Sequence, residues 1–493
     1  MPIPIRTLST AAAGIGLSGA GYYMFKNKQQ AGTQQDLKTD GNIDQQHPPQ
    51  QFYDSRPFKW LSPEDINSRL RAGQLANKVN LDRVRAVYTS QVASNNPVED
   101  HYSTYLIGSK GLFAGVYDGH IGPLCSKLIR KQLPSYVARQ LENKTDKQSV
   151  EEAISTAFED LDQDIQQRFY DLFPRNVQRL NEKDVQDAVR KHADPAAADL
   201  IIKEAIHGSC ACAVYLDGDD LYAANTGDSR VVIVRQEEDG TWSGRRLVEE
   251  ESPANPEWKA HMISQHPPNE AGNIIHRNRI FGLIAVGGSF GDIMYKVPRE
   301  YQIKVLPFIP YEAYSTFARY HHRIVVNYRT PPYLSSKPLT SHHKLQKGDK
   351  YVIIGTDGLW DELSWDDVRS ESGDQVAAQL ISTWKSGDKE ANPATHMIRE
   401  SLLFDAVYKN VGERVPVTDA TLEMSKRLTR QPSRRYRDDI TVTVIELKDQ
   451  EDQEAAPFQD VGPVTSAEQI EIQPRLATPK QSNWYSGWLW SRL

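Results

Sequence analysis

Short apolar runs alternate with longer helical patterns along residues 59–447. Two longer stretches, Val150–Phe169 and Gln375–Thr383, carry apolar residues at helical spacing. The Asp217-Gly218 pair between two of the short runs is a hairpin signal and favours antiparallel pairing. We therefore predict an α+β fold with antiparallel sheets covered by helices. The runs that read as strands, each rich in β-branched or aromatic residues, are Leu112–Tyr117, Ala211–Tyr215, Leu221–Ala224, Val231–Val234, Tyr351–Gly355 and Ile440–Ile445.

The N-terminal segment lacks this pattern and is basic. Residues 1–35 contain Arg6, Lys26 and Lys28 and no acid, which resembles a mitochondrial presequence. The uncharged stretch Thr7–Phe25 is close to the shortest length that spans a bilayer, but it contains four glycines. Three alternatives stay open: a cleaved presequence, a presequence with a membrane anchor, and a secretory signal. The low cysteine count argues against secretion.

Polar, proline-containing segments flank the patterned body. Residues 27–58 are rich in Gln, Asp and Pro, which predicts a flexible linker. Residues 448–493 are predicted to be a disordered tail, and they end in Ser491-Arg492-Leu493, which resembles the Ser-Lys-Leu peroxisomal address. We therefore predict a targeting segment at 1–26, the linker, a globular domain at 59–447 and the tail. The expected location is the mitochondrion, with a second pool in peroxisomes.

Composition narrows the class of protein. Hydrophobic residues make up 39% of the 493 residues and charged residues 25%, as in soluble globular proteins. The 65 acidic residues outnumber the 58 Lys and Arg, giving a net charge of -7, which argues against a general nucleic-acid-binding protein. Only three cysteines are present (Cys125, Cys210 and Cys212), which excludes a disulfide scaffold and a tetrathiolate zinc site.

Carboxylates stand at the ends of the predicted strands. Asp118 and Asp357 each follow a strand, Asp228 lies just beyond a third, and Asp438 precedes the last. Any one of them alone would be explained as a turn residue. Together, at the ends of neighbouring strands, they would crowd negative charge that a cation must neutralise. An all-oxygen site suits Mg²⁺ or Mn²⁺ rather than zinc.

The sequence lacks the common signatures of a phosphate-binding loop and of a zinc protease. The Walker-type GxxxxGK[ST] and HExxH motifs are both absent. A metal-activated water is therefore the expected attacking group. Two metals would clamp the attacking and leaving oxygens of a phosphoryl transfer.

Six motifs, in this order along the body, resemble the metal-dependent type 2C serine/threonine protein phosphatases. The resemblance implies a central antiparallel β-sandwich flanked by helices on both sides. It also implies hydrolysis of phosphoserine by a metal-activated water. The motifs are Asp118-Gly119-His120-Ile121-Gly122, Gly208-Ser209-Cys210-Ala211, Ala224-Asn225-Thr226-Gly227-Asp228-Ser229-Arg230, Phe290-Gly291-Asp292, Asp357-Gly358-Leu359-Trp360-Asp361 and Asp438-Asp439-Ile440-Thr441.

Within this family the chain is similar to the pyruvate dehydrogenase phosphatase branch. The similar segments are residues 93–100, 329–334, 394–399 and 436–439. The resemblance implies that the partner is the phosphorylated E1 component of the pyruvate dehydrogenase complex. Three alternatives are another mitochondrial or peroxisomal substrate, a pseudophosphatase that only binds, and a membrane-tethered scaffold. No core metal carboxylate is missing, which argues against the pseudophosphatase.

The resemblance assigns metal ligands residue by residue. Asp118 bridges two Mg²⁺ or Mn²⁺ ions, the Gly119 carbonyl binds one of them, and Asp357 and Asp438 complete the other. Glu99 acts through bound water. A weaker third metal site is matched by Asp228 and Asp361.

Further residues match roles around the metals. His120 is the implied general acid that protonates the leaving serine oxygen, and the alternative is a buried structural histidine. Most family members have an Arg four residues before the Glu, whereas this chain has Asn95, which we assign to the substrate phosphate. We expect Asp439 to hold a loop and Arg230 to be structural.

Two long segments and the chain ends are the expected contact regions. Residues 297–329 and 391–436 exceed what a minimal family member needs, so we expect them to recognise the substrate. Further expected contacts are a membrane, through the N-terminal segment, and a peroxisomal import receptor, through the C-terminal tripeptide.

Overall fold

The computed structural model describes most of the predicted globular domain. The targeting segment 1–26 with its Thr7–Phe25 stretch, most of the linker and the tail from residue 449 lie outside the described residues. No helix in the described part is both long and apolar enough to cross a bilayer. The described residues are 56–79, 81–108, 111–310, 314, 318, 320–363, 372–384, 392–410, 413–414 and 419–448.

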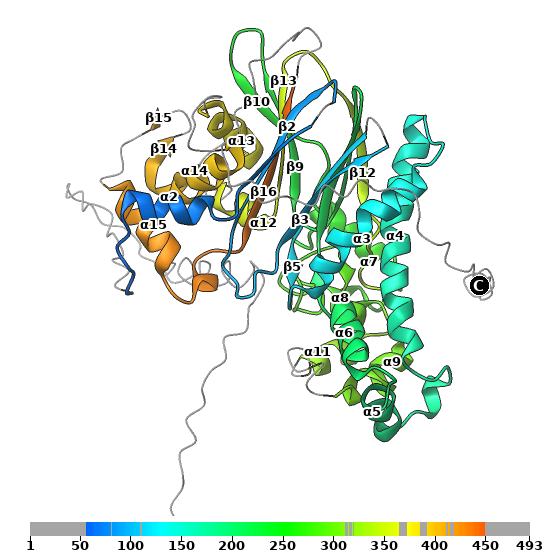
Figure 1. Ribbon diagram of the computed structural model, residues 1–493. Helices are drawn as coiled ribbons and strands as arrows, with labels where there is room; N and C mark the ends of the chain where they lie inside the picture. The colour runs from blue at the N-terminus through cyan, green and yellow to red at the C-terminus, as the bar shows by residue number, and fades with distance from the viewer. Residues whose placement is uncertain are drawn as a thin grey trace, which may run out of the picture.

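Two antiparallel sheets stack face to face at the centre of the molecule (Figure 1). The six-stranded sheet has the order β1-β2-β16-β13-β9-β10, and the five-stranded sheet has the order β12-β8-β7-β4-β3. The strands of the six-stranded sheet are β1 (Leu75–Lys78), β2 (Val84–Val92), β9 (Arg230–Gln236), β10 (Trp242–Arg246), β13 (Asp349–Gly355) and β16 (Ile440–Leu447). Those of the five-stranded sheet are β3 (His101–Ile107), β4 (Gly111–Tyr117), β7 (Ala211–Asp217), β8 (Asp220–Thr226) and β12 (Leu339–Lys344).

Strand β4 shows why the central strands read as uninterrupted apolar runs. All seven of its residues are buried. Leu112, Ala114 and Val116 pack in the core between the two sheets. Phe113 and Tyr117 point the other way, into the core beneath the helices. Because side chains alternate along a strand, a strand covered on both faces needs apolar residues at every position.

Helices cover the outer face of each sheet, as Figure 1 shows. This arrangement confirms the predicted sandwich flanked by helices. Against the six-stranded sheet lie α2 (Pro63–Arg71), α12 (Asp357–Leu363), α13 (Gly373–Ser382), α14 (Pro393–Val407) and α15 (Ala420–Thr429). On the other side lie α3 (Leu124–Gln140), α4 (Lys147–Asp171), α5 (Glu182–Arg190), α6 (Pro195–Ile206), α7 (Pro256–Ser264), α8 (Ala271–Ile274), α9 (Arg299–Lys304) and α11 (His321–Asn327).

Shorter elements complete the fold. Strands β5 (Gly119–His120), β6 (Gly208–Ser209) and β11 (Phe290–Gly291) form a small sheet beside the sandwich, and β14 (Tyr408–Asn410) pairs with β15 (Glu413–Arg414). The 3₁₀ turns are η1 (Val177–Arg179), η2 (Ile293–Tyr295), η3 (Leu306–Phe308) and η4 (Ser433–Arg435).

The predicted elements are confirmed, and their observed ends differ from the predicted ones by a few residues at most. The six apolar runs are β4, β7, β8, β9, β13 and β16, and the two helical patterns lie in α4 and α13. The Asp217-Gly218 turn joins β7 to β8, whose residues Asp217 and Asp220 face each other. The long segment 297–329 contains α9, η3 and α11, while 391–436 contains α14, β14, β15, α15 and η4.

Candidate active site

Three aspartates converge at one end of the sandwich. Asp118 follows β4, Asp228 lies in the turn between β8 and β9, and Asp357 begins α12 directly beyond β13. One carboxylate oxygen of each lies within 4.8 Å of the other two. The three come from both sheets, so stacking of the sheets creates the cluster. All three keep partial exposure, which leaves them open to an ion from solvent.

The carboxylates of the cluster repel one another. Burial and the neighbouring Asp357 charge raise the pKa of Asp118 well above its ordinary value. The same two causes raise the pKa of Asp228 to about 7. Burial raises the pKa of Asp438 to about 8, although Arg434 opposes the shift. Negative charge held together in this way is unfavourable without a cation.

The donor set fits a hard divalent cation. Every side chain of the cluster offers oxygen, the ligand that Mg²⁺ and Mn²⁺ prefer. Asp357 Oδ1 is buried and accepts no hydrogen bond from any described residue. Asp361 lies one turn along α12 from Asp357, and burial and the Asp357 charge raise its pKa too. The acidic cluster can therefore hold a metal.

The loop before β3 is held against this end of the sandwich by Asp439. The Asp439 carboxylate accepts hydrogen bonds from the backbone N–H groups of Ser94, Asn95 (2.8 Å) and Glu99 (2.8 Å). The Asn95 side-chain amide also donates to it, at 3.0 Å. Asp439 thus holds the loop, as expected, and the side-chain amide of Asn95 is already bonded to the same carboxylate.

Glu99 and Gly119 meet where this loop touches β5. A Cβ atom on Gly119 would lie 2.2 Å from the Glu99 carbonyl oxygen, so only glycine allows this approach. Burial, followed by the Asp439 charge, raises the pKa of the Glu99 carboxyl to about 7. Glu99 is therefore another acid at this end of the sandwich whose charged form is disfavoured.

His120 is held by a second buried acid. Its Nε2 lies 2.7 Å from Oδ2 of Asp292, and the Ser289 hydroxyl donates to the same oxygen at 2.7 Å. Burial lowers the pKa of His120, but the Asp292 carboxylate more than offsets this, so the pKa is raised overall. A Cβ atom on Gly208 would lie 1.9 Å from His120 Nε2, so this glycine makes room for the ring.

Two residues at the site were not predicted as functional. Asp292 stands in the Phe290-Gly291-Asp292 motif, and that motif was the available signal. Arg434 of η4 contacts Asp438, and no motif pointed to it. Arg230 is structural as expected, since it pairs with Glu250 and Asp374.

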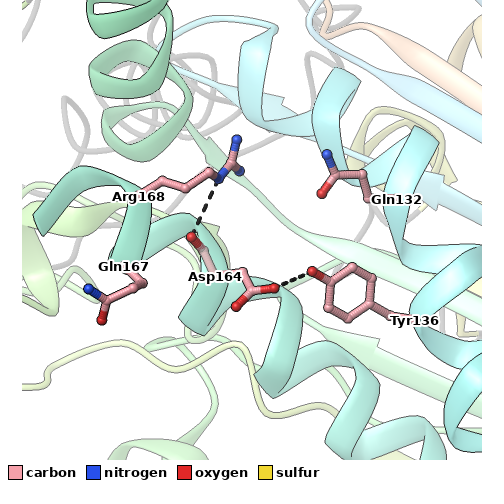
Figure 2. Close-up of a pocket in the computed structure, with 5 residues that line it drawn as sticks. All are labelled: Gln132, Tyr136, Asp164, Gln167 and Arg168. Carbon is pink, nitrogen blue, oxygen red and sulfur yellow. Dashed lines mark hydrogen bonds between the residues drawn. The ribbon is translucent and has the colours of Figure 1, made fainter. Parts of the chain in front are cut away.

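A separate polar hollow lies between α3 and α4 (Figure 2). Its volume is about 250 Å³, and it contains none of the predicted site residues. Figure 2 shows the Tyr136 hydroxyl donating to the Asp164 carboxylate and the Arg168 side chain donating to the Asp164 backbone carbonyl. The residues lining it are Gln132, Tyr136, Asp164, Gln167 and Arg168.

Known proteins share this sequence pattern. The family model for protein phosphatase 2C matches residues 105–384. Mitochondrial [pyruvate dehydrogenase [acetyl-transferring]]-phosphatase 1 of Bos taurus is 28% identical over 464 residues, covering 80% of this chain and 85% of that protein. Phosphatase 2 of the same name from Homo sapiens is 28% identical over 451 residues, covering 78% and 83%.

A solved structure is also similar. Serine-threonine phosphatase 2C from Toxoplasma gondii is 13% identical, with a TM-score of 0.43, covering 76% of this chain and 99% of that one. The family match extends over more than half of the chain and includes Asp118, Asp228 and Asp357. The chain therefore belongs to the protein phosphatase 2C family and is a metal-dependent protein serine/threonine phosphatase.

Proposed function

We propose that this phosphatase dephosphorylates phosphoserine on the E1 component of pyruvate dehydrogenase in mitochondria. The catalytic part rests on one observation, the convergence of Asp118, Asp228 and Asp357 within 4.8 Å. The choice of substrate and compartment rests on relatives named as mitochondrial pyruvate dehydrogenase phosphatases in mammals and in Saccharomyces cerevisiae.

We assign the cofactor as Mg²⁺ or Mn²⁺, with two ions in each active site. Asp118, the Gly119 carbonyl, Asp357 and Asp438 would hold the two ions, and Glu99 would act through water. Asp228 and Asp361 would hold a weaker third ion. Bound cations supply charge neutralisation for the phosphate and a water of lowered pKa.

The protein's own acid would be His120. A serine alkoxide is a poor leaving group, so a proton delivered to its oxygen lowers the barrier. Asp292 occupies His120 Nε2, which leaves Nδ1 as the nitrogen that transfers the proton. The Asp292 carboxylate also favours the charged ring that this step requires.

The test is dephosphorylation of phosphorylated pyruvate dehydrogenase E1 by the purified full-length protein. We expect turnover with Mg²⁺ or Mn²⁺ and none with a chelator. A panel of other mitochondrial and peroxisomal phosphoproteins should be cleaved more slowly. Faster turnover of any panel member would replace E1 as the substrate, while leaving the phosphatase activity itself intact.

A second pool in peroxisomes remains a prediction from Ser491-Arg492-Leu493, which lies outside the described residues. Deleting Leu493 from the full chain should remove any peroxisomal pool without reducing the mitochondrial one. Removing residues 1–26 should shift protein towards peroxisomes. If the protein without residues 1–26 stays wholly cytosolic, the tripeptide is not a targeting signal.

A further inference from the structure

Arg434 brings a positive charge to the carboxylate cluster. It belongs to η4, which follows α15 and precedes β16, inside the long segment 391–436. Its side chain is 13% exposed, and its Nη1 forms an ion pair with Asp438 Oδ2. Burial lowers the pKa of Arg434, but the charges of Asp438, Asp357 and Asp118 raise it overall. The guanidinium therefore lies within electrostatic reach of these three carboxylates.

One donor of Arg434 has no acceptor among the described residues. Its Nε is buried and unpaired there, whereas Nη1 pairs with Asp438. A guanidinium carries five N–H donors, and buried donors without acceptors are unfavourable. Unused donors facing a reaction site indicate a ligand that supplies acceptor oxygens.

The nearby Arg437 provides the contrast. Its guanidinium donates to the backbone carbonyl oxygens of Val92 (3.2 Å), Ala93 and Asp438 (3.1 Å). The guanidinium donors of Arg437 are thus engaged in holding the loop that precedes Glu99. Arg434 lies three residues earlier, pairs with Asp438 through Nη1, and has an Nε with no acceptor among the described residues.

Asn95 is poorly placed to bind the phosphate by itself. Its side-chain amide already donates to Asp439, and an amide carries no charge to match a phosphate dianion. In the described part of the chain, Arg434 is the cation in contact with a carboxylate of the cluster. A planar guanidinium fork also matches two phosphate oxygens at once.

We propose that Arg434 is the ligand of the substrate phosphate, in place of the Arg that most family members carry where this chain has Asn95. Cations held by Asp118, Asp357 and Asp438 would neutralise Asp438 and so weaken its ion pair with the guanidinium. The free donors of Arg434 then bind oxygens of the phosphoserine group. The proposal rests on the phosphatase activity and does not depend on which phosphoprotein is the substrate.

The experiment compares full-length Arg434→Gln, Arg434→Lys and Arg435→Gln with the natural protein. Arg435 is the matched control, because it follows Arg434 in the same turn and is exposed. The primary measurement is calorimetric titration of the Mn²⁺-loaded protein with inorganic phosphate. Inhibition of para-nitrophenyl phosphate hydrolysis by phosphate, the Mn²⁺ half-saturation and the melting temperature complete the set.

We expect Arg434→Gln to weaken phosphate binding about 10- to 100-fold, the range for charge-assisted hydrogen bonds. The KM for a phosphopeptide should rise by a similar factor. Arg434→Lys keeps the charge but loses the fork, so its loss should be smaller. Arg435→Gln should match the natural protein. Adding Asn95→Arg to Arg434→Gln should restore part of the phosphate affinity.

Two results would overturn the proposal. Unchanged phosphate affinity with a lower melting temperature would make Arg434 a structural residue. Unchanged phosphate affinity with a shifted Mn²⁺ half-saturation would make it only a counter-charge for Asp438. If Arg434→Gln does not fold, Arg434→Lys decides, since it keeps the ion pair. None of these outcomes depends on E1 being the substrate, so the two proposals fail separately.

Discussion

Carboxylates occur in two contrasting settings in this molecule. In one, Asp162 of α4 meets Lys296 at 2.8 Å, with side chains only 4% and 2% exposed. Lys296 also donates to the Ser289 carbonyl, and Asp162 accepts from the Gly291 N–H. In the other, Asp118, Asp228 and Asp357 face one another, and no Lys or Arg in the described part of the chain forms an ion pair with them.

The difference shows that the paired carboxylate stabilises the fold, whereas the carboxylate cluster serves the chemistry. The Asp162–Lys296 pair satisfies both charges and fixes residues 289–291, next to Asp292. The aspartate cluster is unfavourable by itself, and burial and repulsion raise the pKa of Asp118 and of Asp228. A protein retains such repulsion when a bound cation and the chemistry it supports compensate for it.

The strongest test of the contrast removes one acid from the cluster. Asp118→Asn should reduce phosphopeptide turnover by at least about 10⁴-fold, because cation binding itself fails. The same change removes repulsion, so the melting temperature in chelator should stay level or rise. Asp82→Asn, on an exposed residue, is the control for both measurements. Near-normal turnover in Asp118→Asn would refute the two-metal assignment.

The next test concerns His120. It contacts Asp292, which directly follows the residues that the Asp162–Lys296 pair fixes. His120→Gln should slow phosphoserine hydrolysis by about 10²- to 10⁴-fold, the range for general acids. Hydrolysis of para-nitrophenyl phosphate should fall much less, since para-nitrophenolate leaves without a proton. Comparing the two kcat values checks this. Equal losses on both substrates would instead indicate a structural histidine.

Removing one charge of the Asp162–Lys296 pair should lower the stability of the fold rather than the catalytic turnover. Lys296→Met leaves the Asp162 charge buried and unpaired, which costs about 3–5 kcal/mol of unfolding free energy. Urea unfolding measures the loss. The double variant Lys296→Met/Asp162→Leu should recover much of it, because no lone charge remains. Lys183→Met, in an exposed ion pair, should leave the unfolding midpoint essentially unchanged. A double variant no more stable than the single one would contradict this account.

The smallest expected effect is on the pH dependence of stability, and it concerns His207, which folding keeps neutral. Burial, followed by the His120 charge, lowers the pKa of His207 to about 4 from the ordinary 6.5. A lowered folded-state pKa means that this stability is present above pH 6.5 and is lost as pH falls from 6.5 towards 4. The loss should be about 2 kcal/mol, since one pKa unit is about 1.4 kcal/mol and the ring keeps some solvent contact.

His207→Gln should therefore flatten the dependence of unfolding free energy on pH in that window. His192→Gln, on a partly exposed residue, should not change it. Denaturant unfolding at several pH values between 4 and 7 gives the comparison. An unchanged slope in His207→Gln would show that other groups control the acid sensitivity.

The sequence predicts the centre of the fold better than its rim. Strand β16 is buried at all eight positions, and its own run of residues is enough to predict a strand. Strand β12 carries Thr340, Ser341, His342 and His343, and only its pairing with β8 makes it a strand. An edge strand depends on its neighbour more than on its own pattern, which local sequence does not contain.

The residues of the site also differ in how well the sequence predicts them. Asp118 and Asp357 were predictable because each directly follows a strand that is itself recognisable. Asp292 reaches His120 across 172 residues of sequence. Arg434 lies in the long segment 391–436 and in none of the six motifs, so no motif marks it. Contacts of this kind appear only when the whole chain is folded.

The place of β16 has a consequence for when the enzyme becomes active. This strand lies between β2 and β13, so the last strand of the domain fills the middle of a sheet begun near its start. Asp438, Asp439 and Arg434 arrive with it or just before it. A chain still emerging from the ribosome, or one that ends before Asp419, lacks both the central strand β16 and Asp438, a proposed metal ligand. Activity is therefore tied to completion of the domain, and a truncated chain cannot act as a partial phosphatase.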